Sequence, residues 1–322
     1  MRLTATTLAL MLSATAASAQ TTLTLYTSQS PEIAQQTVDA FMAKHPDITV
    51  EWMRNGTSQL MNILSAEQQA GGIKADVLLV ADSINLGTLK SQDLLLAWPE
   101  APLEGIDPLM YDADKTFFGT KISSTGIVYN TQIAEPVSGW ADLFQDANAG
   151  QIVAPSPLYS GAALVHMHSL LQDPTQGWAY YERLNALGVV PEGGNGPVLK
   201  AVAGGQVKYG VNIDADVQRA RKAGSPVEFV YPTEGATFFT EPVAILANTD
   251  QVEAAKTFVS FVLSEDGQKL AAEQGYIPVN PKVASPEGMP ALSEIKLMPL
   301  DADRAVAEDV EARARFTEIF GG

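Results

Sequence analysis

The sequence Ala75-Asp-Val-Leu-Leu-Val80 is a short, mostly apolar run of the kind that forms a strand buried in a parallel sheet. Gly71-Gly72 ends the helical pattern before it, and Asp82-Ser83 begins the next one. The same order of strand then helix occurs twice earlier, with strands expected at residues 23–27 and 48–53. Three successive units of this kind predict an open α/β sheet.

Polar residues follow each of these three expected strands. Ligands of open α/β sheets bind at the edge where the strands have their carboxyl ends. We therefore expect the polar residues to form one rim of a binding site. They are Ser28, Gln29, Ser30, Thr57, Asp82 and Ser83.

Two extended runs, near residues 122–129 and 238–246, separate a middle block of strands and helices from the flanking ones. This pattern predicts two lobes joined by a two-strand hinge, with a ligand cleft between them. Residues 20–122 and 246–322 are expected to form a discontinuous first lobe. Residues 123–245 are expected to form the second lobe.

The middle block contains Ala154-Pro-Ser-Pro-Leu-Tyr-Ser-Gly-Ala-Ala-Leu164, in which a turn leads into an apolar helix. Ser160 suits the N-cap of that helix, and Gly161 leaves the backbone N–H groups of the first turn accessible. An ordinary capped helix is the simpler interpretation. An anion site at Ser160, Gly161 and Ala162 is the functional one, with Tyr159 at its side.

The composition excludes several classes of partner. A net charge of −17 disfavours nucleic acid and anionic membranes, and the absence of cysteine removes disulfides and thiolate metal sites. The first 19 residues carry one basic residue, a short apolar run and Ala17-Ser18-Ala19 before Gln20. This pattern predicts a signal peptide, 1–19, cleaved near Ala19, and a periplasmic protein without a membrane span.

The sequence offers little support for an enzyme. It has three histidines, of which His166 and His168 are two apart on an expected helix and therefore point to different faces. The nucleophile-elbow, zinc-protease and P-loop motifs are absent. A secreted hydrolase stays a remote alternative, and no cofactor is expected.

Several further short stretches stand out in order along the chain. They include Ser160-Gly-Ala162, Asn195 with Gly204-Gly205, Ala254-Ala-Lys-Thr-Phe-Val-Ser-Phe-Val262 and Ser264-Glu-Asp-Gly-Gln268. Together these stretches resemble the periplasmic solute-binding proteins of ABC importers, in the group containing ferric-ion-binding and 2-aminoethylphosphonate-binding proteins. The resemblance covers the mature chain to about residue 280. It implies a type II periplasmic-binding-protein fold, a small-molecule ligand, a cognate inner-membrane permease and a monomer.

The iron-binding half of that family's site is mostly missing. A first-loop histidine is replaced by Ser30, and the tyrosine pair falls on Ala215-Asp216. Only Asp82 stands where the family has an acid. Ferric iron needs hard anionic donors, and the loss of both tyrosines counts against an iron site. A ferric-iron transport protein with non-tyrosine donors and a synergistic anion is therefore kept only as the alternative function.

The anion-binding half is retained, because Ser160, Asn195 and Asn212 match family positions that hold the anion. Asp214 matches an acid suited to an ammonium group, and an N-cap role is its rival. The resemblance therefore implies a receptor for a small anionic or zwitterionic solute. A phosphonate or phosphate ester such as 2-aminoethylphosphonate is favoured. Whether Arg54 or Lys121 reaches the anion stays open.

Overall fold

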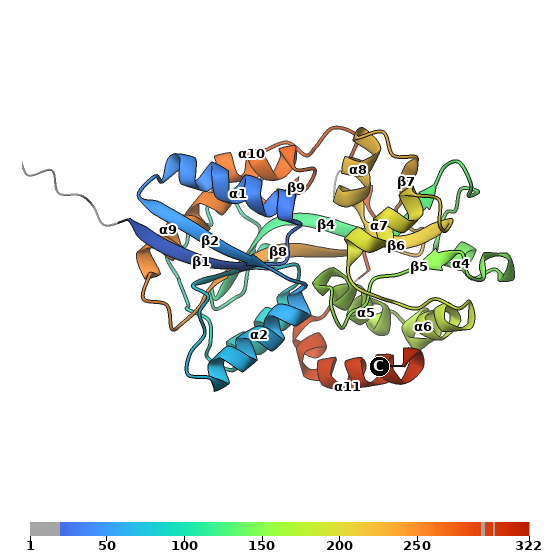
Figure 1. Cartoon of the computed structure of the whole chain (residues 1–322), viewed down its shortest axis with the longest axis horizontal. Coiled ribbons are helices and arrows are strands. Elements are labelled where there is room, and N and C mark those ends of the chain that lie inside the picture. The colour runs from blue at the N-terminus through green and yellow to red at the C-terminus, as the bar shows by residue number, and fades with distance from the viewer. Residues whose placement is uncertain (1–19, 291–293, 299, 322) are drawn as a thin grey trace, which may run out of the picture.

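Two long strands, β4 (Phe117–Asn130) and β8 (Thr237–Ile245), run antiparallel through the centre of the molecule (Figure 1). The computed structural model describes residues 20–290, 294–298 and 300–321. The expected signal peptide, 1–19, lies outside the described residues. A register shift between Gly119 and Ile122 interrupts the pairing of β4 with β8. Each strand therefore has one part on either side of this irregularity.

The other elements are arranged around these two strands. The remaining strands are β1 (Thr21–Thr27), β2 (Ile48–Arg54), β3 (Val77–Leu79), β5 (Ile152–Val153), β6 (Tyr209–Ile213), β7 (Val227–Val230) and β9 (Ile277–Pro278). The helices are α1 (Pro31–Lys44), α2 (Thr57–Gln69), α3 (Ser83–Ser91), α4 (Trp140–Leu143), α5 (Gly161–Gln172), α6 (Gly177–Ala186), α7 (Asn195–Ala203), α8 (Asp214–Lys222), α9 (Val252–Leu263), α10 (Glu265–Glu273) and α11 (Ala302–Phe320). Short 3-10 turns are η1 (Pro108–Met110) and η2 (Asp146–Asn148).

The strand order β2-β1-β3-β8-β4-β6-β5 explains how two lobes arise from one continuous sheet path. In the first lobe, β1 pairs in parallel with β2 and β3, and β3 continues antiparallel onto β8. In the second lobe, β4 pairs with β6 and β7, and β6 continues in parallel onto β5. Figure 1 shows β1 and β2 at one end and β6 and β7 at the other.

Each lobe has its own apolar core. In the first lobe, Phe41 of α1 packs edge-on against Phe258 of α9, with ring centroids 5.0 Å apart. In the second, Trp140 packs against Tyr180, with centroids 5.5 Å apart. Tyr180 and Tyr181 are buried, as their place in an amphipathic helix predicts. Within the described residues, no helix has the length and apolar character that crossing a membrane requires.

The last helix, α11, contacts both halves of the molecule. It packs on α3 of the first lobe and on α5 and α6 of the second (Figure 1). Phe316 of α11 lies edge-on to Tyr181 of α6, with ring centroids 5.4 Å apart. The division into residues 20–122 with 246–322 and residues 123–245 therefore stays a prediction, because α11 has a large contact with the second lobe.

The buried His166 makes the stability of the second lobe depend on pH. One ring nitrogen lies 3.2 Å from Thr237 Oγ1 and the other lies 3.2 Å from Tyr180 OH. Burial lowers the pKa of His166 to about 3, from an ordinary value of 6.5. The unfolded chain therefore binds a proton here below pH 6.5, whereas the folded protein does not until near pH 3. This contribution to stability is complete above pH 6.5 and is lost as the pH falls.

We predict that His166→Gln removes part of this acid sensitivity. Between pH 7 and pH 5, the free energy of unfolding of the wild type should fall by about 2 kcal/mol more than that of the variant. Urea titrations followed by circular dichroism measure both values. From pH 8 to pH 7 the two proteins should change in parallel. Equal losses between pH 7 and pH 5 would show that His166 does not carry the effect.

Candidate functional site

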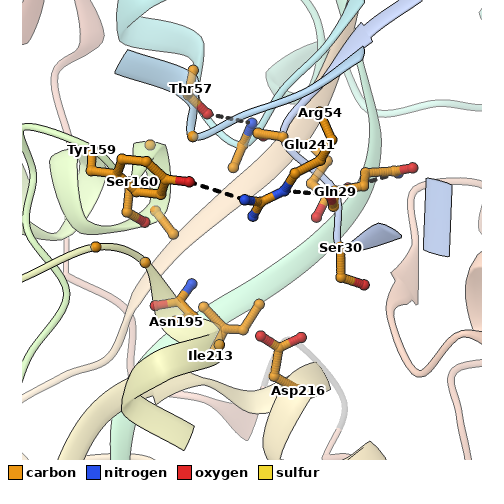
Figure 2. Close-up of a pocket in the computed structure, with 18 of the residues that line it drawn as sticks. Gln29, Ser30, Arg54, Thr57, Tyr159, Ser160, Asn195, Ile213, Asp216 and Glu241 are labelled. Atoms are coloured by element: carbon orange, nitrogen blue, oxygen red, sulfur yellow. Dashed lines mark hydrogen bonds between the residues drawn. The ribbon is translucent and has the colours of Figure 1, made fainter. Parts of the chain in front are cut away.

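A cavity of about 350 Å³ lies where the carboxyl ends of β1 and β2 face the first turns of α5 and α7 (Figure 2). The first-lobe wall consists of the turns that follow β1 and β2. The second-lobe wall consists of the glycine-rich starts of the two helices. This is the place that the strand order predicts for a ligand, at the strand ends between two lobes.

Most of the residues that the sequence suggested for a site line this cavity. Phe239 of β8 lines the cavity as well. The structure thus places the suggested residues at the cavity, whereas their contact with a solute stays a prediction. The suggested residues in the lining are Ser28, Gln29, Ser30, Thr57, Tyr159, Ser160, Gly161, Ala162 and Asn195.

The start of α5 is built for close approach of the two lobes. Ser160 is the N-cap, and its Oγ accepts a hydrogen bond from Ala163 N at 3.4 Å. A Cβ added to Gly161 would lie 2.2 Å from Asp82 Oδ2 and 2.6 Å from Thr57 Oγ1. Only glycine fits this position in the closed cleft. The start of the helix, whose first N–H groups have no partner within it, thus lies at the wall of the cavity.

The start of α7 adds a second helix N-terminus. Gly193, with a φ of +57°, turns the chain into the cavity wall ahead of Asn195. Asn195 Oδ1 is buried and has no hydrogen-bond partner among the described residues. Asn212 is not in the lining of this cavity, and its contact with a solute stays a prediction. Asn212 is fully buried; its Nδ2 donates to Asn195 O at 2.9 Å and its Oδ1 accepts from Ile213 N, so it fixes α7 from behind.

Arg54 supplies a positive charge at the cavity, whereas Lys121 does not line it. Its Nε donates to Gln29 O at 3.1 Å, and its Nη1 donates to Tyr159 OH at 3.0 Å (Figure 2). Unlike Arg219 and Arg313, it forms no salt bridge within the described part of the chain. A guanidinium held only by neutral oxygens retains its capacity to bind an anion.

Acidic groups occupy another part of the wall. Glu241 is 5% exposed; its Oε2 accepts from Gln29 Nε2 at 3.0 Å and pairs with Lys121 Nζ at 3.2 Å. Asp216 pairs with Arg219, and burial raises the pKa of Asp216. Gln29 Oε1 is buried and has no partner among the described residues. The wall here offers acceptors, whereas Arg54 and the helix starts offer donors.

Asp214, for which the sequence suggested an ammonium-binding role, makes other contacts in this structure, and that role stays a prediction. Asp214 is the first residue of α8, is fully buried and does not line the cavity. Its carboxylate accepts from Ser123 Oγ, Ser124 N, Ala215 N and Tyr231 OH. These bonds tie β4, α8 and the chain after β7 together. Asp216, two residues further along α8, lines the cavity instead.

The two remaining suggested residues also lie outside the cavity lining. Asp82 is fully buried and caps α3, where its Oδ1 accepts from Asn85 N at 2.7 Å. Ser83 lines a separate cavity next to Phe238. Among the residues that the structure describes, no group of three or more His, Cys, Asp or Glu side chains is placed to hold a metal ion.

Similarity to known proteins agrees with this geometry. A probable ABC transporter periplasmic-binding protein, y4fP, of Sinorhizobium fredii is 26% identical over 287 residues, covering 84% of this chain and 78% of the relative. The spermidine/putrescine-binding periplasmic protein of Salmonella typhimurium is 30% identical over 180 residues. That match covers 51% of this chain and only 50% of the relative.

Solved structures share the fold. AfuA of Actinobacillus pleuropneumoniae, with exogenous fructose-6-phosphate bound, superimposes with a TM-score of 0.85 at 21% identity, over 94% of this chain and 99% of that chain. Iron-bound HitA of Pseudomonas aeruginosa gives 0.79 at 22% identity, over 92% and 99% of the two chains. The expected two-lobed periplasmic-binding-protein fold is confirmed.

The profile of one protein family spans most of the chain. Residues 36–296 match the family described as bacterial extracellular solute-binding protein. The match includes the end of β2 and the starts of α5 and α7, which line the cavity, whereas β1 and the turn after it precede the matched residues. The chain therefore belongs to the bacterial extracellular solute-binding proteins.

Proposed function

We propose that this substrate-binding protein of an ABC transporter captures a small anionic or zwitterionic solute in the periplasm. The favoured solute is a phosphonate or phosphate ester such as 2-aminoethylphosphonate. In this proposal the mature protein begins after cleavage near Ala19, acts as a monomer without a cofactor and delivers its solute to an inner-membrane permease. The names of its relatives, which include periplasmic ABC-transporter proteins, support this role.

The observation that carries the proposal is the unpaired Arg54 guanidinium in a cavity that also borders two helix N-termini. A phosphonate group has three acceptor oxygens, which suit the N–H donors of Arg54 and of the α5 and α7 starts. Hydrogen bonds to a charged group contribute about 1.5–3 kcal/mol, and a helix N-terminus about 0.3–1 kcal/mol. Together these donors favour a compact oxyanion.

The acceptors at Glu241, Asp216 and Gln29 Oε1 support a zwitterion over a simple anion. A primary ammonium donates up to three hydrogen bonds, and the unpartnered Gln29 Oε1 is a free acceptor for one of them. The carboxylates of Glu241 and Asp216 add a favourable electrostatic field. A cavity of about 350 Å³ suits a small solute with both groups.

A polyamine is the second candidate, because Asp216 and Glu241 line the cavity and one set of relatives is named for spermidine and putrescine. Polyamines carry no anionic group for Arg54 to bind. Ferric iron with a synergistic anion is a further alternative, which a neighbour's title raises. The cavity residues Tyr159 and Asp216 would then be the donors to examine.

We predict that isothermal titration separates these solutes. 2-Aminoethylphosphonate and phosphoethanolamine should bind in the micromolar range or tighter, about −8 kcal/mol or better. Fructose-6-phosphate should bind more weakly, because it lacks the ammonium. Putrescine and ferric citrate should give no heat of binding. Binding of putrescine or of iron alone would contradict the proposal.

A second prediction concerns Arg54→Met, which keeps an unbranched side chain and removes the charge. The affinity for the phosphonate should fall about tenfold to hundredfold, the loss expected for a charged hydrogen-bond donor. Arg221→Met is the matched control, because Arg221 is solvent-exposed and pairs with Glu228 outside the cavity lining. Equal affinities of the two variants would place the anion elsewhere.

A further inference from the structure

The guanidinium of Arg313, on α11, bonds to both lobes at once. Its Nη1 donates to Ser58 Oγ at 3.0 Å and to Pro157 O at 3.3 Å, and its Nη2 donates to Asn85 Oδ1 at 3.4 Å. Ser58 and Asn85 belong to α2 and α3 of the first lobe. Pro157 lies in the turn that leads to α5 of the second lobe. The Nε of Arg313 donates to Asp309 Oδ2 at 2.8 Å.

Asp309 anchors this arginine to the second lobe. Its other oxygen, Oδ1, lies 3.0 Å from His168 Nε2, and His168 is a fully buried residue of α5. The side chains of Arg313 and Asp309 are only 22% and 13% exposed, so solvent screens their interaction less than that of a surface pair. Through Asp309 and His168 the second lobe orients Arg313, whose guanidinium also bonds to Ser58 and Asn85 of the first lobe.

The bonds of Arg313 reach the segments that form the cavity wall. Ser58 Oγ also donates to Pro157 O at 3.2 Å, and Ser58 N donates to Tyr159 O at 3.3 Å. These contacts fix the first turn of α2 against the turn before α5. Thr57 and Gly161, which face each other across this contact, line the cavity.

We propose that Arg313 is a positioning residue of the solute site: it clasps α2 to the turn before α5 and so favours the closed cleft. Arg313 does not touch the solute in this proposal; it acts through Ser58 and Pro157. This inference rests on the proposed function in one respect, namely that a solute binds in the cleft. It does not depend on which solute that is.

Arg315, two residues further along α11, provides a matched control. It bonds to Glu318 at 2.9 Å and to Glu182 at 3.5 Å, and its side chain is 47% exposed. Arg315→Met therefore removes an arginine of the same helix without touching α2 or the turn before α5. Arg313→Lys retains the charge and part of the donor capacity, and serves as the conservative variant.

The test measures the opening of the cleft without solute and the affinity for it. Because the chain has no cysteine, spin labels attach only to introduced ones. Asn62→Cys on α2 and Lys200→Cys on α7 are exposed positions on opposite lobes. Double electron–electron resonance then reports the inter-lobe distance. Isothermal titration uses 2-aminoethylphosphonate, or whichever member of the solute panel binds.

We expect Arg313→Met to shift the distance distribution to longer values and to weaken binding about tenfold. Arg313→Lys should restore part of both, and Arg315→Met should match the wild type. Unchanged distances and affinity in Arg313→Met would overturn the clasp, even if its melting temperature fell.

Two further results keep the test decisive. If Arg313→Met does not fold, Ser58→Ala removes the hydroxyl that accepts the hydrogen bond of Arg313 Nη1. An unchanged inter-lobe distance and an unchanged solute affinity in Ser58→Ala would overturn the proposal. If no solute of the panel binds, the proposed function fails. The distances in the solute-free protein still decide whether Arg313 holds the lobes together.

Discussion

The close approach of the two lobes at Gly56 and Gly161 is the constraint on which the site depends. A Cβ at Gly56 would lie 2.4 Å from Tyr159 O, and one at Gly161 would lie 2.2 Å from Asp82 Oδ2. Neither glycine has a positive φ, so the requirement is for space and not for backbone freedom. The backbone of each glycine therefore packs directly against the other lobe, Gly56 against Tyr159 O and Gly161 against the side chains of Asp82 and Thr57. This close approach brings the start of α5 to the wall of the cavity.

The distribution of charge then gives the cavity its chemical character. The chain carries a net charge of −17, yet Arg54 faces the cavity without an acidic partner within the described residues. The hinge strands contribute an acidic group, Glu241 of β8, whose charge is offset by a buried ion pair with Lys121 of β4 beside Gln29. Burying such a pair costs desolvation energy and is weak evidence for stability. A role in recognising the solute gives it a physical reason to exist.

The architecture was predictable because it depends on local patterns. Apolar strands followed by polar turns predict the α/β units, and two extended runs anticipate β4 and β8. The helix start at Ser160 is predictable for the same reason. The contacts of Asp214 were not predictable, because its four hydrogen-bond donors come from β4, α8 and the chain after β7, which no local pattern reveals. Glu241 was missed because it meets Gln29 from 212 positions away. Arg54, whose role the sequence left open, did have a sequence signal, because it lies at the carboxyl end of β2.

Substitution of Gly161 by aspartate tests whether the anionic group of the solute binds at the start of α5. The new carboxylate would lie at that helix start, and its Cβ would clash with Asp82 and Thr57. Titration of Gly161→Asp with the solute that the wild type binds should show an affinity loss of about a hundredfold or more, since repulsion and impeded closure act together. An affinity equal to that of the wild type would contradict the account, because the solute would then bind away from the α5 start.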